Sequence, residues 1–145
     1  MNFKLIQICN DHESVLLAQD AGIDRIMLDL ETKGKKKRQK NLDSVISNHT
    51  YKDIKYFRKM IKTSELMVRV NPLNNNSQLE IQKVIDLGAD RIMLPMFRSQ
   101  NEVEKVIDMI NGQIPLTLLL ETSTALVRLS NILELYPEEL LEQLQ

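Results

Sequence analysis

The pentapeptide Asp-Arg-Ile-Met-Leu occurs twice in this chain of 145 residues, at residues 24–28 and 90–94. A glycine lies in the short turn before each copy. The copies start 66 residues apart (90 − 24). A βαβ unit takes roughly thirty residues, so this interval corresponds to about two β/α steps. Apolar, strand-like segments that recur at such a period indicate a repeating β/α fold. Functional side chains in these folds gather at the carboxyl ends of the strands.

Further apolar runs and amphipathic segments complete the pattern. We expect strands at 3–9, 25–30, 66–70, 91–95 and 116–120. We expect helices at 11–20, 50–62, 77–88, 99–112 and 122–135. Strongly apolar strands that alternate with amphipathic helices are typical of a parallel sheet covered by helices. The predicted fold class is therefore α/β, with a parallel (β/α)5 array over residues 1–135. A short acidic helix or tail is predicted over residues 136–145.

Two architectures fit this element order. One is a part of a (β/α)8 barrel, a partial TIM barrel, and the other is an open, doubly wound, flavodoxin-like sheet. Length favours the open sheet, because a whole barrel takes about 250 residues. The polar residues that follow the strands favour the barrel. A phosphate-binding role for the open sheet is opposed by the segment after the first strand, where residues 10–13 contain no glycine.

Composition limits the classes of partner. The formal net charge is −1, which gives no overall attraction to nucleic acid or membrane. No apolar stretch has the length of a membrane span. The single cysteine, Cys9, excludes an internal disulfide and favours a reducing, cytoplasmic setting. His12 and His49 are too isolated to suggest a metal site.

Candidate residues for chemistry lie at the ends of all five expected strands. They are Asn10; Asp29, Glu31 and Thr32; Arg69 and Asn71; Met96 and Arg98; and Glu121 and Thr122. In a parallel β/α fold these positions converge at the carboxyl ends of the strands, on one face of the barrel that is called the mouth below. Arg69 can bind a carboxylate bidentately or stabilise an enolate oxygen. Glu121 can supply a hard oxygen ligand for Mg²⁺ or Mn²⁺. The pattern suits a small carboxylate substrate, with Asn71 and Thr122 as further candidate substrate-binding residues.

Four motifs in order carry a resemblance to a known family. They are Leu-Asp-Leu-Glu at 28–31, Val-Arg-Val-Asn at 68–71, Leu-Gly-Ala-Asp-Arg-Ile-Met-Leu-Pro-Met at 87–96, and Leu-Leu-Glu-Thr at 119–122. Together they resemble the HpcH/HpaI aldolase and citrate lyase β-subunit family, within the phosphoenolpyruvate/pyruvate-binding barrels. The resemblance covers residues 3 to about 135, the five N-terminal β/α units.

The resemblance implies a lyase or aldolase that makes or breaks a carbon–carbon bond next to a 2-oxo acid or an acyl thioester. The family mechanism runs through a metal-stabilised enolate. By position, Arg69 would hold the carboxylate or enolate oxygen of the substrate. Glu121 would be the metal ligand after the fifth strand. Asp29 and Glu31 would line the mouth near the metal and its waters.

The chain departs from the family pattern at two places. The aldolase branch has a catalytic histidine after the acidic motif of strand two, and this chain has Thr32 there, which is no base near neutral pH. The family's second metal ligand is an aspartate after strand six, which this sequence does not contain. A truncated, non-catalytic half-barrel that binds a small carboxylate or phosphate is therefore the alternative function.

Two further features concern partners. The basic segment 33–40, with Lys35 and Arg38, is a candidate anion-binding loop beside the second strand end. It is short and lacks interleaved aromatic residues, so we do not expect it to bind nucleic acid. A five-strand array leaves its first and last strands unpaired. Unpaired edges favour association with other chains, so we expect self-association through these edges.

Overall fold

The computed structural model describes residues 3–32 and 48–135, which contain one five-stranded parallel sheet. The strands are β1 (Ile6–Ile8), β2 (Arg25–Asp29), β3 (Glu65–Arg69), β4 (Arg91–Leu94) and β5 (Leu116–Leu118). The helices are α1 (His12–Asp20), α3 (Tyr51–Met60), α4 (Ser77–Asp86), α5 (Gln100–Ile110), α6 (Ser123–Val127) and α7 (Leu129–Leu133). Every expected strand and its following helix is present.

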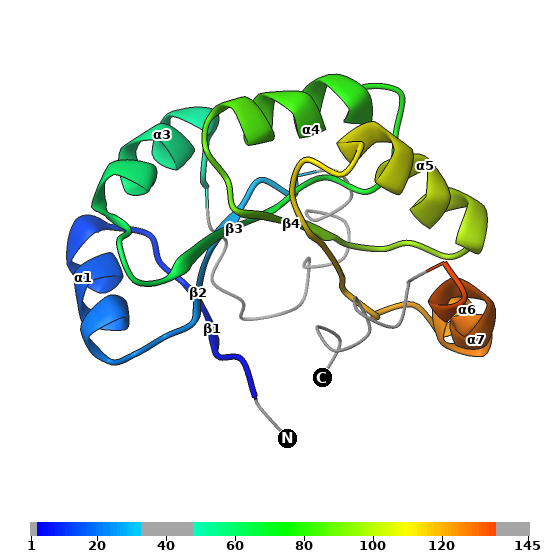
Figure 1. Ribbon diagram of the computed structural model, residues 1–145, viewed down its shortest axis with the longest axis horizontal. Helices are drawn as coiled ribbons and strands as arrows, with labels where there is room; N and C mark the ends of the chain where they lie inside the picture. The colour runs from blue at the N-terminus through cyan, green and yellow to red at the C-terminus, as the bar shows by residue number, and fades with distance from the viewer. Residues whose placement is uncertain (1–2, 33–47, 136–145) are drawn as a thin grey trace.

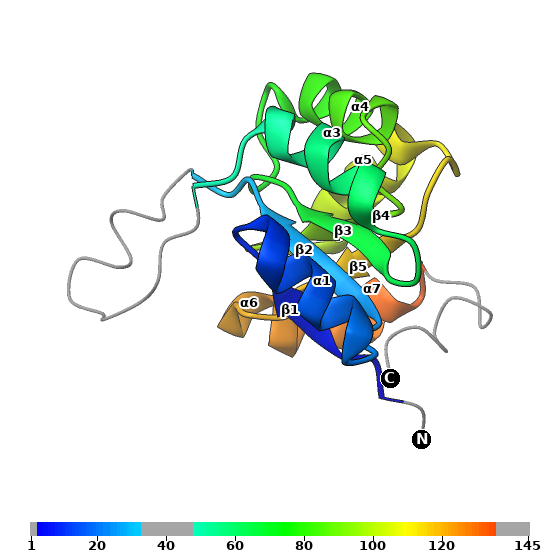
Figure 2. The same cartoon turned by 90° about the vertical axis from the view of Figure 1, so that its left-hand side faces the viewer.

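The order of the strands decides between the two expected architectures. It is β1-β2-β3-β4-β5, so each strand lies beside its neighbours in sequence. A flavodoxin-like sheet has the order 2-1-3-4-5 and helices on both faces. Here α1, α3, α4 and α5 all follow the convex side of a curved sheet (Figure 1). When the left-hand side of Figure 1 faces the viewer, α1 and α3 lie in front of the strands (Figure 2). The partial barrel is confirmed, and the doubly wound alternative is wrong.

The two faces of the sheet differ in what they bury. The face toward the helices carries the main apolar core, in which Ile26 and Leu28 of β2 and Ile92 of β4 are fully buried. The concave face carries a separate methionine layer, formed by Met27, Met67 and Met93 with Leu119 packed against it. Alternate residues of a strand point to opposite faces, so the odd-numbered residues of β2 to β5 line the interior of the partial barrel.

An ionic cluster lies on the concave face below the methionine layer, toward the amino ends of the strands. Glu65 of β3 accepts hydrogen bonds from Arg25 Nε at 2.8 Å and from Arg91 Nε at 3.0 Å. Arg91 Nη1 also lies 3.4 Å from the hydroxyl of Thr117 on β5. Because these four residues come from four neighbouring strands, the cluster ties β2, β3, β4 and β5 together inside the barrel.

The structure departs from the expected boundaries most clearly at two elements. The first strand covers Ile6–Ile8 rather than all of residues 3–9. The expected helix 122–135 is broken at Arg128, whose backbone (φ −103°, ψ 12°) leaves the helical range and separates α6 from α7. The predicted tail 136–145 and the loop residues Lys35 and Arg38 lie outside the described residues. Among the described helices, none has the length and apolar character needed to cross a membrane.

Candidate functional site

A buried ion pair between β2 and β3 lies at the carboxyl end of the sheet. Arg69 Nε donates to Asp29 Oδ1 at 2.9 Å, and Arg69 Nη2 donates to Asp29 Oδ2 at 2.7 Å. The two residues are partners in the β2–β3 register, which explains their contact. The Asp29 side chain is 1% exposed and that of Arg69 is 16% exposed. Such a bidentate pair fixes the plane of the guanidinium.

The acidic surroundings of Arg69 further stabilise its charged form. The hydrogen bonds to Asp29 raise the pKa of Arg69 above its ordinary value; burial lowers it, and the charges of Asp29, Glu31 and Glu121 raise it further. Asp29 takes the Nε–Nη2 edge of the guanidinium. Nη1 has no hydrogen-bond partner among the described residues. Arg69 therefore offers a second donor edge, Nη1–Nη2, to an anion.

Glu31 follows β2 and completes the acidic side of this pair. Its Oε2 lies 3.6 Å from Arg69 Nε, and its side chain is 3% exposed. The backbone N–H of Glu31 donates to Asp29 Oδ1 at 3.0 Å. Asp29 and Glu31 each make further interactions as well. The predicted trio of Asp29, Glu31 and Arg69 is thus brought together, with Asp29 acting directly on the arginine.

Glu121 comes from the opposite side of the same mouth, after β5. It lies on the concave side of the chain, two residues beyond Leu119 of the methionine layer. Its Oε1 accepts the backbone N–H of Met96 at 3.0 Å. Met96 has a left-handed backbone, with φ 57°, which costs a non-glycine residue about 1 kcal/mol. This conformation follows β4 and accompanies the hydrogen bond to the Glu121 carboxylate.

Both the nitrogen and the oxygen of the Asn71 side-chain amide make hydrogen bonds. Its Nδ2 donates to Glu80 Oε1 at 2.8 Å and to the carbonyl of Leu30 at 3.3 Å. Its Oδ1 accepts the backbone N–H of Thr32 at 2.9 Å. These contacts use Asn71 to join the ends of β2 and β3 to α4. Its predicted contact with substrate stays a prediction.

Glu80 belongs to the site region and is not among the predicted site residues. Its spacing from Ser77 suggests a helix capping box. In the structure Asn76 is the N-cap of α4, and Glu80 Oε1 instead accepts from the backbone N–H of Asn71 at 3.2 Å as well as from its side chain. Glu80 is 8% exposed. Glu80 shares the buried face of α4 with Ile81 and Val84, and a charged residue on an apolar helix face is the signal that could have indicated a buried partner.

Thr122 also has a defined local role. Its hydroxyl donates to the carbonyl of Phe97 at 2.8 Å and accepts from the backbone N–H of Ala125 at 3.1 Å. The side chain therefore caps α6 and connects the segments that follow β4 and β5. Since the hydroxyl hydrogen is used by Phe97, a substrate could reach only the remaining acceptor position of Thr122.

The resemblance implies a bound divalent cation, which would need oxygen ligands from side chains at the mouth. No three His, Cys, Asp or Glu side chains within residues 3–32 and 48–135 come together as a metal site. Both oxygens of Asp29 bind Arg69, whereas Glu121 Oε2 has no hydrogen bond among the described residues. Mg²⁺ is often held by one or two carboxylates with water and substrate oxygens. Glu121 could supply one such carboxylate, with the other ligands coming from water and substrate.

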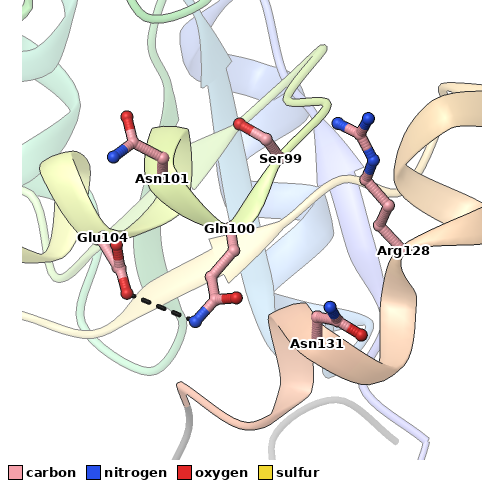
Figure 3. A pocket seen from close by; sticks show the side chains of 6 residues that line it. All are labelled: Ser99, Gln100, Asn101, Glu104, Arg128 and Asn131. Atoms are coloured by element: carbon pink, nitrogen blue, oxygen red, sulfur yellow. Dashed lines mark hydrogen bonds between the residues drawn. The ribbon is translucent and has the colours of Figure 1, made fainter.

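A polar pocket of about 430 Å³ lies away from these residues, between the start of α5 and the α6–α7 segment. Its lining residues are Ser99, Gln100, Asn101, Glu104, Arg128 and Asn131. Figure 3 shows Arg128 and Asn131 facing the first turn of α5, where Gln100 is hydrogen-bonded to Glu104. Neither Arg69 nor Glu121 borders this pocket. The strand-end mouth, rather than this pocket, collects the predicted site residues.

Comparisons with known proteins agree with this architecture. A solved structure, the HpcH/HpaI aldolase from Desulfitobacterium hafniense DCB-2, superposes with a TM-score of 0.66 at 14% identity. The match covers 90% of this chain and 57% of that chain. No curated protein matches the sequence. The family model described as HpcH/HpaI aldolase/citrate lyase matches residues 8–140. This chain therefore belongs to the HpcH/HpaI aldolase/citrate lyase family.

Proposed function

We propose that this protein takes part in metal-dependent carbon–carbon lyase or aldolase chemistry on a 2-oxo acid. The observation that carries the proposal is the arrangement of Arg69. Its guanidinium is held by buried Asp29 through one edge, and Nη1 on the other edge makes no hydrogen bond within residues 3–32 and 48–135. The charge of Glu121 helps to raise the pKa of Arg69. A 2-oxo acid presents a carboxylate and a neighbouring carbonyl oxygen, which suit an arginine edge and a cation respectively.

Each residue has a defined task in this proposal. Arg69 binds and orients the substrate carboxylate through Nη1 and Nη2, and Asp29 keeps the guanidinium in place. Glu121 would hold Mg²⁺ or Mn²⁺ together with substrate oxygens and water. The bound cation would supply positive charge where negative charge develops on the 2-oxo oxygen. The methionine layer beneath, which contains Met67 and Met93, closes the floor of the mouth to water.

The test is deuterium exchange at the methyl group of pyruvate, followed by proton NMR in heavy water with Mg²⁺ or Mn²⁺ added. We expect exchange that depends on the metal ion and is lost in Glu121→Gln. Arg69→Lys keeps a positive charge beside Asp29 but removes the planar fork. We expect this variant to fold and to exchange about 100-fold more slowly, the usual effect of losing one transition-state donor.

Lys105→Ala provides the control, because Lys105 is exposed on α5 and has no part in the mouth. It should exchange at the wild-type rate. Absence of exchange in the wild type at any metal concentration would exclude this activity for the chain. Equal exchange in the wild type, Arg69→Lys and Glu121→Gln would exclude the assigned roles.

A second candidate is an anion-binding partial barrel without turnover. One observation favours it: no three His, Cys, Asp or Glu side chains gather as a metal site in the described residues, where Glu121 has one carboxylate oxygen without a hydrogen bond. Oxalate would then raise the unfolding temperature by mass action, while pyruvate would show no exchange. A cytoplasmic location belongs to either proposal and is supported by the free, buried Cys9.

A further inference from the structure

The imidazole of His49 connects the ends of β1 and β2 at the mouth. Its Nδ1 lies 2.9 Å from the backbone nitrogen of Asp29, and its Nε2 lies 2.9 Å from the carbonyl oxygen of Cys9. A backbone N–H only donates and a carbonyl only accepts. The ring must therefore accept at Nδ1 and donate at Nε2, which is the neutral form with its proton on Nε2.

This ring takes the place of one rung in the β1–β2 ladder. The backbone N–H of Arg25 donates to the carbonyl of Leu5 at 3.0 Å. In a parallel ladder the acceptor advances by two residues at each step, so Asp29 N–H should meet the carbonyl of Cys9. Instead the imidazole stands between them and bonds to both. It holds β1 and β2 apart at their carboxyl ends while it satisfies both backbone groups.

The bridge satisfies two buried backbone groups. With the ring in place Cys9 is 0% exposed and Asp29 is 2% exposed, and leaving such backbone groups unpaired would be costly. The ring of Phe57 on α3 packs edge-on against His49, with centroids 6.4 Å apart at 71°. The sheet and α3 thus fix the orientation of the imidazole from two sides.

We propose that His49 is a positioning residue for the anion-binding arginine. Its hydrogen bond fixes the backbone of Asp29, and the Asp29 carboxylate in turn fixes the guanidinium of Arg69 at 2.9 and 2.7 Å. Both ring nitrogens are occupied, so in this arrangement His49 is not a proton-transfer base. The identity of the anion rests on the proposed function, whereas the link from His49 to Arg69 does not.

Two substitutions distinguish the two hydrogen bonds of His49, one to Asp29 and one to Cys9. In His49→Asn the amide oxygen can occupy the place of Nδ1 and still accept from Asp29. In His49→Gln the amide nitrogen can occupy the place of Nε2 and still donate to the carbonyl of Cys9. Each variant keeps one hydrogen bond and loses the other. A purely structural role predicts similar losses in both, whereas the positioning role depends on the bond to Asp29.

The first measurement is NMR of the ligand-free protein. The ¹⁵N spectrum of wild-type His49 should show a protonated Nε2 and an unprotonated Nδ1. The Arg69 Nε–H signal should stay protected from solvent exchange in His49→Asn and lose that protection in His49→Gln. A proton on Nδ1 in the wild type, or equal protection of Arg69 in both variants, would overturn the proposal.

The second measurement is oxalate binding by calorimetry. We expect His49→Asn to bind within a few-fold of the wild type and His49→Gln to bind at least about tenfold more weakly, the scale of one lost hydrogen bond. Equal weakening in both variants would count against positioning. If the wild type binds no oxalate while the Arg69 signal still distinguishes the variants, the proposed ligand is wrong and the positioning role stands.

Discussion

At the scale of single residues, the Asp29–Arg69 pair should contribute both stability and function. Asp29→Asn leaves a guanidinium that is 16% exposed opposite a neutral partner. Removing one member of a buried pair typically costs about 3–5 kcal/mol, and urea unfolding should show a loss of that order. Asp29→Asn combined with Arg69→Met should cost less than the sum of the two single substitutions, because each single substitution already breaks the ion pair. A single variant as stable as the wild type would contradict this reasoning.

The candidate site was predictable from sequence only in part. Arg69 and Glu121 each follow an apolar strand, and parallel strands end at one edge, so their shared mouth could be predicted. The hydrogen bonds of Asn71 and Thr122 could not. They depend on Glu80, nine residues along the chain, and on a backbone carbonyl at Phe97, and strand spacing gives no information on such partners.

At the scale of elements, the repeated pentapeptide has the same local role in both copies. Asp24 Oδ2 accepts the backbone N–H of Leu5 at 2.9 Å, and Asp90 Oδ2 accepts that of Leu66 at 2.8 Å. Each aspartate thus ties the start of its strand to the preceding strand. The methionines of both copies enter the same layer on the concave face. The repeated residues form equivalent strands of the sheet. The residues that follow the two copies differ from each other and lie at the mouth.

The arginines of both copies converge on Glu65 of β3, which predicts a pH dependence. Burial raises the pKa of Glu65, but the hydrogen bonds and charges of Arg91 and Arg25 outweigh it and leave the pKa below its ordinary value. A lowered carboxylate pKa stabilises the fold above the unfolded-state value and loses that contribution as pH falls through the folded value. Stability should therefore begin to fall near pH 4.3, the ordinary value for glutamate.

Glu65→Gln tests this assignment by urea unfolding between pH 7 and pH 3. The variant should be less stable than the wild type at neutral pH, since Arg25 and Arg91 lose their charged partner. The difference between the two proteins should shrink as the pH falls. Parallel stability curves over the whole range would mean that Glu65 does not contribute to the acid dependence.

Element boundaries were less predictable than element types. Apolar runs and amphipathic segments indicated five strands and their helices; in the structure Asp11 and Ser99 cap α1 and α5. The break at Arg128 between α6 and α7 has no glycine or proline to mark it. There the Arg128 side chain donates to the carbonyl of Arg98 at 3.3 Å, a contact set by the tertiary structure.

At the scale of the whole molecule, the five strands of the described residues form a sheet with two edges. Within the described residues β1 pairs only with β2, and β5 pairs only with β4. Figure 1 shows α1, α3, α4 and α5 on the convex side of the sheet. Near β1, Ile6 is 42% and Ile8 is 39% exposed, although both face the barrel interior in register with β2.

We propose that the protein self-associates through these edges, since an exposed apolar edge strand invites pairing. Sedimentation velocity should show a mass that rises with concentration. Ile8→Lys places a charge on the exposed concave side of β1 and should shift the equilibrium toward monomer. Leu79→Lys is the matched control, because Leu79 is 75% exposed on α4 and lies away from both edges. A compact monomer at every concentration, or equal effects of the two lysines, would rule out edge-mediated association.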